Sequence, residues 1–296
     1  MSEINNTPAI KRGWLRALLI LLPFIIITGI FQIIGTIVLA LASDINMMEM
    51  LQNPSDTSTS TFLVIQFFGT IGTLLLVWIF TRFIDQKQII DLGFALQKRA
   101  KDILYGLLTG FIMMGAGSLI LYYTGHLYFE SITFSLIGLT QSLLLFILVA
   151  INEEVFVRGY LLRNFMDSMN KYIALIVSSL LFMALHLLNP NLSLVGTINI
   201  FLAGLLLGIS YIFTKNLWFP LALHFSWNFF QGPIFGFEVS GTSSTPLITH
   251  SIQGSELITG GQFGLEGSII ATVLCSLGIL LFWRIYKKQD IVIATN

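Results

Sequence analysis

The sequence predicts an all-α, polytopic integral membrane protein with about eight transmembrane helices, and three observations lead to this fold class. Hydrophobic residues make up 55% of the 296 residues, charged residues make up 10%, and the mean hydropathy is +0.85. A soluble globular domain carries about a quarter charged residues. The second observation is a series of apolar stretches of membrane-spanning length, and the third is a one-sided distribution of Lys and Arg.

Apolar stretches of about 20 residues, enough to cross a bilayer, recur along the whole chain. They run at about 17–42, 62–81, 103–124, 136–160, 172–188, 193–214, 217–235 and 268–285. The first stretch follows Lys11, Arg12 and Arg16, as the core of a secretory signal would. It exceeds the about 7–15 apolar residues of a signal core and has no clear small-residue cleavage site. We therefore expect it to be retained as the first span.

The distribution of charge predicts the orientation. If the amino end is cytoplasmic and the sides alternate, all 15 Lys and Arg residues fall on the same side of the membrane. The segments assigned to the outer side carry no Lys or Arg: 43–61, 125–135 and 236–267. By the positive-inside rule, we expect both termini in the cytoplasm and a multi-pass location in the cell membrane, inner or plasma. A count of seven spans would export the basic tail at 284–288, which the same rule disfavours.

The chain has no internal repeat and no Pro-rich linker, so we expect one membrane domain. It would comprise a cytoplasmic segment at 1–16, a membrane domain at 17–285 and a cytoplasmic tail at 286–296. Formal net charge is zero, which gives no indication of nucleic acid as a partner. Cys275 is the single cysteine, so an intramolecular disulfide and a cysteine metal cluster are excluded. For the outer segment 236–267, a cap and a mobile loop remain open alternatives.

Six polar or ionisable side chains interrupt the apolar segments between residues 150 and 230. They are Glu153, Glu154, Arg158, His186, His224 and Asn228. A single Arg, Lys or Asp at the centre of a membrane helix costs about 2.5–3.5 kcal/mol, so these groups are expected to pair or to face a water-filled cavity. His126 and His250 lie in polar outer loops, and we assign them no role.

Helical spacing predicts a division of labour within this set. Residues four apart are neighbours on a helix, so Glu154 can pair with Arg158, and His224 shares a face with Asn228. Glu153 points about 100° away from Glu154, toward His186 and His224 on other helices. A desolvated carboxylate beside imidazoles is a candidate general base. Each pattern alone also fits a solvated helix end or a packed histidine, but their conjunction on three of four successive spans favours chemistry.

Three segments together resemble the motifs of a family of intramembrane proteases. They are Glu153-Glu154-Val-Phe-Val-Arg158-Gly159, Phe182-Met-Ala-Leu-His186 and His224-Phe-Ser-Trp-Asn228. In order and separation they are similar to the motifs of the CAAX protease and bacteriocin-processing (CPBP, or Abi) family, which includes type II CAAX prenyl endopeptidases and lysostaphin-resistance-like proteins. The zinc signature His-Glu-x-x-His and the rhomboid and presenilin motifs are absent from the sequence. The resemblance places a CPBP-like core at about 136–235.

The resemblance implies a role for each of these residues. Glu153 would activate a water for attack on a peptide carbonyl, His186 and His224 would hold that water or polarise the carbonyl, and Asn228 would stabilise the oxyanion. Glu154, Arg158 and Phe182 would support the site. The catalytic cavity would lie among spans four, five and seven, and the substrate would be a peptide or protein, membrane-tethered or lipidated ones included.

Two questions stay open at this stage. Glu153, His186 and His224 would supply three ligands for a divalent metal such as zinc, and the alternative, which we favour, is a metal-free water held by hydrogen bonds. The rivals to an enzyme are a non-enzymatic immunity or scaffold protein, with the polar cluster locking the helices, and a proton-coupled transporter. CAAX-type processing and bacteriocin-related processing or immunity are equally compatible with the motifs.

Three further expectations concern geometry. For Glu153 to reach His186, the fourth helix must start near Leu139 and continue past Arg158 toward Arg163. Pro220 is expected near the start of the seventh span, where proline is tolerated. The Gly204-x-x-x-Gly208 spacing is expected to allow close packing between helices.

Overall fold

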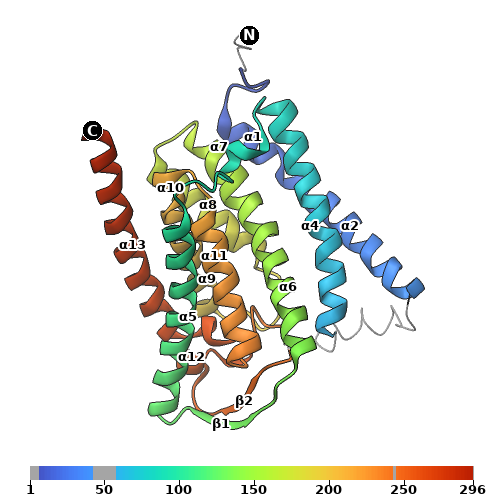
Figure 1. The fold of residues 1–296 in the computed structure, drawn as a ribbon, viewed down its shortest axis with the longest axis vertical. Coiled ribbons are helices and arrows are strands. Elements are labelled where there is room, and N and C mark those ends of the chain that lie inside the picture. The colour runs from blue at the N-terminus through green and yellow to red at the C-terminus, as the bar shows by residue number, and fades with distance from the viewer. Residues whose placement is uncertain (1–6, 43–57, 243–244, 296) are drawn as a thin grey trace.

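A computed structural model describes residues 7–42, 58–242 and 245–295, with side chains up to residue 288. Most of the predicted outer loop 43–61, the first six residues of the amino-terminal segment and most side chains of the tail 286–296 lie outside this description. The first described residues and the end of the last helix lie at the same end of the molecule, and a small two-stranded sheet lies at the opposite end (Figure 1).

The described chain folds mainly into helices. The longer ones are α1 (Gly13–Leu19), α2 (Leu21–Ala42), α4 (Thr59–Ile79), α5 (Ala100–Tyr123), α6 (Leu136–Glu154), α8 (Lys171–Leu185), α9 (Leu194–Ile209), α11 (Trp218–Phe229) and α13 (Ile269–Thr295). Three short helices are α7 (Arg163–Met166), α10 (Tyr211–Thr214) and α12 (Glu256–Thr259). π-helical turns are η2 (Phe80–Ile84), η4 (Val155–Leu162) and η5 (Phe230–Ile234), and 3₁₀ turns are η3 (Ile89–Leu92), η6 (Gly261–Phe263) and η7 (Leu265–Gly267).

The all-α, polytopic membrane fold is confirmed. Within the described ranges, 6 helices are long and apolar enough to cross a membrane. They are Gly13–Ala42, Thr59–Ile84, Ala100–Tyr123, Leu136–Met166, Leu194–Thr214 and Ile269–Lys288. The count of eight is not confirmed, because the predicted fifth and seventh spans fold as the shorter helices α8, of 15 residues, and α11, of 12 residues.

Polar side chains fix where several of these helices begin. Ser58 accepts a hydrogen bond from the Thr61 amide at the start of α4, and Ser135 accepts one from the Gly138 amide at the start of α6. Ser193 serves α9 in the same way. A side-chain oxygen at this position satisfies one of the amide groups that the first helical turn leaves unpaired.

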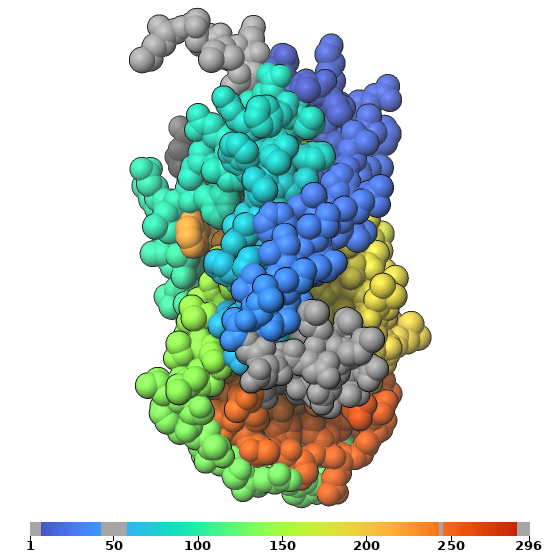
Figure 2. Space-filling model, turned by 90° about the vertical axis from the view of Figure 1, so that its right-hand side faces the viewer, coloured from blue at the N-terminus to red at the C-terminus, as the bar shows by residue number. Residues whose placement is uncertain are grey.

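Small residues allow the helices to approach closely. α11 packs against α5, where a Cβ added at Gly110 would lie 2.5 Å from the Trp227 nitrogen. The close packing expected at Gly204-x-x-x-Gly208 occurs against α8, because a Cβ added at Gly204 would lie 2.9 Å from the Ser179 Cβ. Glycine is therefore required at these contacts by the distance between helices. Figure 2 shows α2 and α4 running side by side over one face of the molecule.

A two-stranded antiparallel sheet lies at the end opposite to the termini (Figure 1). Strands β1 (Leu127–Ile132) and β2 (Ile248–Ile252) pair antiparallel, with an irregularity between Phe129 and Ser131. The sequence predicted only polar outer loops here, because neither strand is long enough to stand out beside the membrane spans. Pairing joins the loop after α5 to the long segment between α11 and α13.

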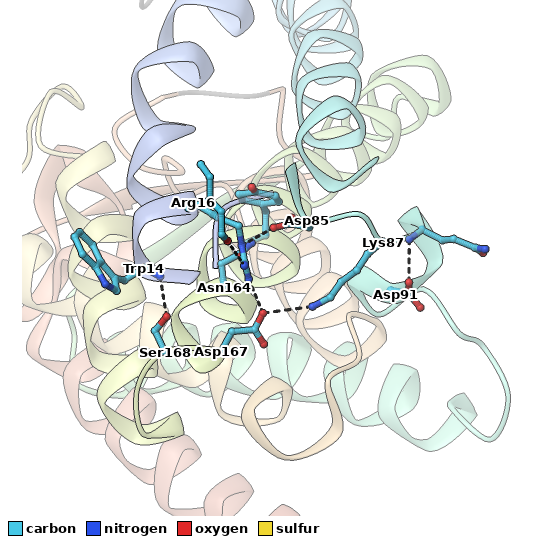
Figure 3. A network of polar contacts seen from close by, with 11 residues as sticks. Trp14, Arg16, Asp85, Lys87, Asp91, Asn164, Asp167 and Ser168 are labelled. Carbon is cyan, nitrogen blue, oxygen red and sulfur yellow. Dashed lines mark hydrogen bonds and ion pairs between the residues drawn. The ribbon is translucent and has the colours of Figure 1, made fainter. Parts of the chain in front are cut away.

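A buried ion-pair network ties the amino-terminal helix α1 to the far end of the fourth predicted span (Figure 3). Arg16 is 1% exposed, and its guanidinium lies 2.7 Å from a carboxylate oxygen of Asp85 and 2.7 Å from one of Asp167. The same side chain donates to the Asn164 amide oxygen at 2.6 Å. Burial raises the pKa of Asp85, and the Arg16 charge opposes that rise. The sequence placed Arg16 at the end of the cytoplasmic segment before the first apolar stretch, and only the tertiary contacts show it buried.

Candidate active site

The helix that carries the first motif is long and continuous. α6, η4 and α7 together run from Leu136 to Met166, 31 residues or about 46 Å. The expected continuation past Arg158 is confirmed, and the helix begins at Leu136, slightly before the expected Leu139. A π-helical stretch, Val155–Leu162, follows the two glutamates, and all of its residues are buried. Such stretches often occur at functional sites.

Glu154 holds two partners at once. It is fully buried, and its Oε1 accepts hydrogen bonds from Arg158 Nη1 and from His224 Nδ1, each at 2.7 Å. The ion pair with Arg158 was predicted from the spacing. The bond to His224 was not, because α11 is distant in sequence. Arg158 also donates to the Gly204 carbonyl at 3.2 Å, which explains why this arginine tolerates burial at 1% exposure.

Phe182 lies at the centre of the same group. The Arg158 guanidinium stands over its ring at 4.4 Å from the centroid. The His186 ring centroid is 4.5 Å away and the His224 ring meets it edge-on at 6.3 Å. This ring therefore fixes the orientation of the two imidazoles and covers the buried cation.

Hydrogen bonding assigns the same tautomer to both histidines. His186 Nδ1 lies 2.7 Å from the Phe182 carbonyl, which can only accept, so Nδ1 carries the proton. His224 Nδ1 faces the Glu154 carboxylate at 2.7 Å and likewise donates. The Nε2 atoms of the two rings are left to face Glu153, whose Oε2 lies 3.5 Å from His186 Nε2 and 3.9 Å from His224 Nε2.

The Glu153 carboxylate faces both imidazoles without a hydrogen bond at Oε2. Its Oε2 is buried and makes no hydrogen bond, and the two distances to Nε2 exceed hydrogen-bond length. The side chain nevertheless keeps 25% of its surface accessible, because it opens on a cavity. Glu153 and Glu154 are thus adjacent in sequence, but Glu153 faces the cavity without a hydrogen bond at Oε2, whereas Glu154 Oε1 accepts two hydrogen bonds.

This cavity has a volume of about 730 Å³ and brings the predicted catalytic residues together. Glu153, His186, His224 and Asn228 all line it, and Asn228 is 6% exposed. Spans four, five and seven contribute, as predicted. The structure adds α2, α4 and α9, which contribute among others Gln32, Gln66 and Asn199.

Parts of the outer segment 236–267 line the cavity. Val239, Ser240, Thr242 and Glu266 from this segment line it together with the catalytic set. These contacts favour the cap over the mobile loop, and the cap stays a prediction. Burial raises the pKa of Glu266, while hydrogen bonds from Ser240 and Trp227 and the nearby His186 oppose the rise.

Sequence reasoning missed several lining residues. Gln32 and Gln66 stand as isolated amides in apolar stretches, a signal that was available. Asn152 directly precedes the first motif, and Glu266 lies in a loop where no pattern distinguishes it from the other outer carboxylates. Glu266 is identified only by the structure, in which this loop contributes to the lining of the cavity.

Comparison with known families agrees with this site. Residues 135–230 match a family model described as type II CAAX prenyl endopeptidase Rce1-like. This part of the chain is therefore similar to an Rce1-like domain. The matched range extends from the start of α6 to the start of η5 and contains all three motif segments, so the resemblance to the CAAX protease family is confirmed. Neither the curated proteins nor the solved structures contain a significant match to the chain.

Glu153 Oε2 and the two Nε2 atoms lie slightly farther apart than the ligands of a tetrahedral zinc. Ligand atoms about 2.0–2.1 Å from a tetrahedral zinc lie about 3.3 Å apart, whereas the Glu153 to Nε2 distances are 3.5 and 3.9 Å. Within the described part of the chain, no group of three or more His, Cys, Asp or Glu is placed to hold an ion. We therefore route no chemical step through a metal.

Proposed function

We propose that this protein is an intramembrane endopeptidase that hydrolyses a peptide bond of a membrane-associated or lipidated peptide or protein. The observation that supports it most is the unpartnered Glu153 Oε2, which faces two Nε2 atoms inside a cavity. A buried carboxylate without a partner costs stability, so its retention needs a role that the fold does not supply. Activation of water is such a role.

The proposed reaction uses the residues in the following way. With the ring proton of each histidine on Nδ1, the Nε2 atoms present lone pairs. The attacking water donates one hydrogen to one of these Nε2 atoms and directs its other hydrogen to Glu153. Glu153 removes a proton from that water, and its oxygen attacks the scissile carbonyl. The Asn228 amide donates to the oxyanion. The proton on Glu153 then passes to the leaving nitrogen as the carbon–nitrogen bond breaks.

Glu154 and Arg158 act as supports in this proposal. Glu154 holds His224 in the tautomer that leaves Nε2 unprotonated, and Arg158 neutralises the charge of Glu154. Preorganisation of this kind matters because a protected cavity excludes bulk water, which strengthens each electrostatic contact.

The structural rivals predict a different use of the same residues. In a scaffold or immunity protein, the polar cluster locks helices together, and every member should be engaged. Arg158 and Glu154 Oε1 fit that description, although Glu154 Oε2 also lacks a hydrogen-bond partner. Glu153 differs because its side chain opens on the cavity and its Oε2 faces two Nε2 atoms without a hydrogen bond. A proton-coupled transporter would show substrate flux in proteoliposomes that depends on a pH gradient. CAAX-type processing is the substrate class suggested by the family model.

The test compares membrane-proximal peptides, by mass spectrometry, in cells that express the wild type or Glu153→Gln. We expect fragments that depend on Glu153. Glu256→Gln is the matched control, because Glu256 is an exposed carboxylate that does not line the cavity. Identical peptide profiles for all three proteins, at equal membrane abundance, would refute the proposal.

A further inference from the structure

The outer segment delivers a second carboxylate to the catalytic cavity. Glu266, in η7, lines the same cavity as Glu153. Its Oε1 accepts from the Ser240 amide and from the Ser240 hydroxyl. Its backbone is held as well, because the Asn199 amide donates to the Glu266 carbonyl at 2.7 Å and to the Ser268 carbonyl at 2.8 Å. The carboxylate is therefore anchored at the capped end of the cavity rather than free to swing into solvent.

The charge of the cavity is one-sided. Its ionisable lining consists of Glu153, Glu266, His186 and His224, and no Lys or Arg is among the described lining residues. Arg158 does not line the cavity, because its guanidinium pairs with Glu154 and donates to the Gly204 carbonyl. A substrate carboxylate in this space would be repelled by Glu153 and Glu266, and no Lys or Arg of the lining would offset that repulsion, which is stronger at low dielectric.

The cavity also has unused hydrogen-bond acceptors. Asn152 is 9% exposed and lines the cavity, yet its Oδ1 has no partner. Glu153 Oε2 is the other buried, unpartnered side-chain atom among the described lining residues, and both are oxygen acceptors. Unmet acceptors beside carboxylates are best satisfied by a group that is rich in N–H donors and positively charged.

We propose that Glu266 selects substrates that carry a cationic, N–H-rich group close to the scissile bond. This group is a Lys or Arg side chain or a free amino group. The inference rests on the proposed endopeptidase function and narrows its substrate class. Occupation by a cation favours the charged form of Glu266, which burial alone disfavours.

The experiment uses the full-length protein in lipid nanodiscs and a set of lipid-anchored peptides with a mapped cleavage site. At each position flanking the site, Lys, Arg, Gln and Glu are compared, and a second series compares free with acetylated amino termini. The readout is the ratio of kcat/KM for the cationic peptide to that for its neutral partner. At one of the flanking positions we expect this ratio to be about tenfold or more in the wild type, because a hydrogen bond to a charged group contributes about that difference in binding.

Three variants separate charge selection from a structural role. Glu266→Gln is expected to reduce the ratio at least about fivefold, and Glu266→Asp to retain a preference for the cationic peptide. Ser240→Ala loosens the cap but keeps the carboxylate, so it should preserve the ratio. Glu256→Gln controls for the loss of an exposed outer carboxylate and should also preserve it.

The outcomes distinguish this inference from the proposed function. Glu153-dependent cleavage with equal rates for Lys and Gln at every position, or with a preference for Glu, would overturn the inference alone. An unchanged ratio in Glu266→Gln would do the same. If Glu266→Gln fails to fold, the wild-type peptide series decides the question by itself. Absence of Glu153-dependent cleavage of every peptide would overturn the endopeptidase and this inference with it.

Discussion

Glu154→Gln and Glu153→Gln are expected to change the stability of the protein by different amounts, although the two residues are adjacent. Glu154 is 0% exposed and accepts hydrogen bonds from Arg158 and His224, both at 2.7 Å. Glu154→Gln leaves the buried guanidinium without its counter-charge. Removing one partner of a buried ion pair costs about 3–5 kcal/mol, so we expect the free energy of unfolding to fall by that amount. Cleavage should be lost as well, because His224 is no longer held.

Glu153→Gln should leave stability within about 1 kcal/mol of the wild type, because Oε2 makes no hydrogen bond that could be lost. Arg158→Met in the Glu154→Gln background removes the unpaired charge at similar volume. That double variant should therefore regain at least about half of the lost stability, a strongly non-additive result.

Unfolding of the purified proteins in one detergent, by heat and by SDS titration, measures these differences. Stabilities for Glu154→Gln and Glu153→Gln that agree within error would refute the assignment of one carboxylate as structural and the other as free. A double variant that is less stable than Glu154→Gln would refute the role of Arg158 as a buried, paired charge.

Further predictions concern the support network, the oxyanion and the metal question. Arg16→Ala should lower the free energy of unfolding by about 3–5 kcal/mol because Asp85 and Asp167 lose a buried partner, whereas the exposed Arg12→Ala should change melting little. Asn228→Ala should reduce kcat about 100–1000-fold at a nearly unchanged KM. A rise in KM of the same size with an unchanged kcat would instead indicate a role in substrate binding. Cleavage should survive dialysis against a chelator; loss of activity that zinc restores would show that Glu153, His186 and His224 hold a metal.

The sequence was sufficient for the features that depend on local spacing. The four-residue separation predicted the Glu154–Arg158 pair, and the 100° offset predicted that Glu153 points away from Glu154 and toward the histidines. The need for Glu153 to reach His186 gave the extension of the fourth helix beyond Arg158. These inferences hold because helix geometry alone determines them.

Features that depend on contacts between distant segments were not predictable. Glu154 bonds to His224 across 70 positions, and Glu266 reaches the cavity from the segment between α12 and α13. Arg16 is buried only because Asp85 and Asp167 converge on it. The shortness of α8 and α11 also escaped detection, because hydropathy does not show where a polar connection ends a helix.

The most direct test of the account is hydrolysis of a lipid-anchored peptide by the purified protein in nanodiscs, with products identified by mass spectrometry. The wild type should cut one peptide bond, and Glu153→Gln, with an unchanged melting temperature, should leave the peptide intact. Cleavage at the same bond and at a similar rate by Glu153→Gln would contradict the claim that this carboxylate activates the attacking water.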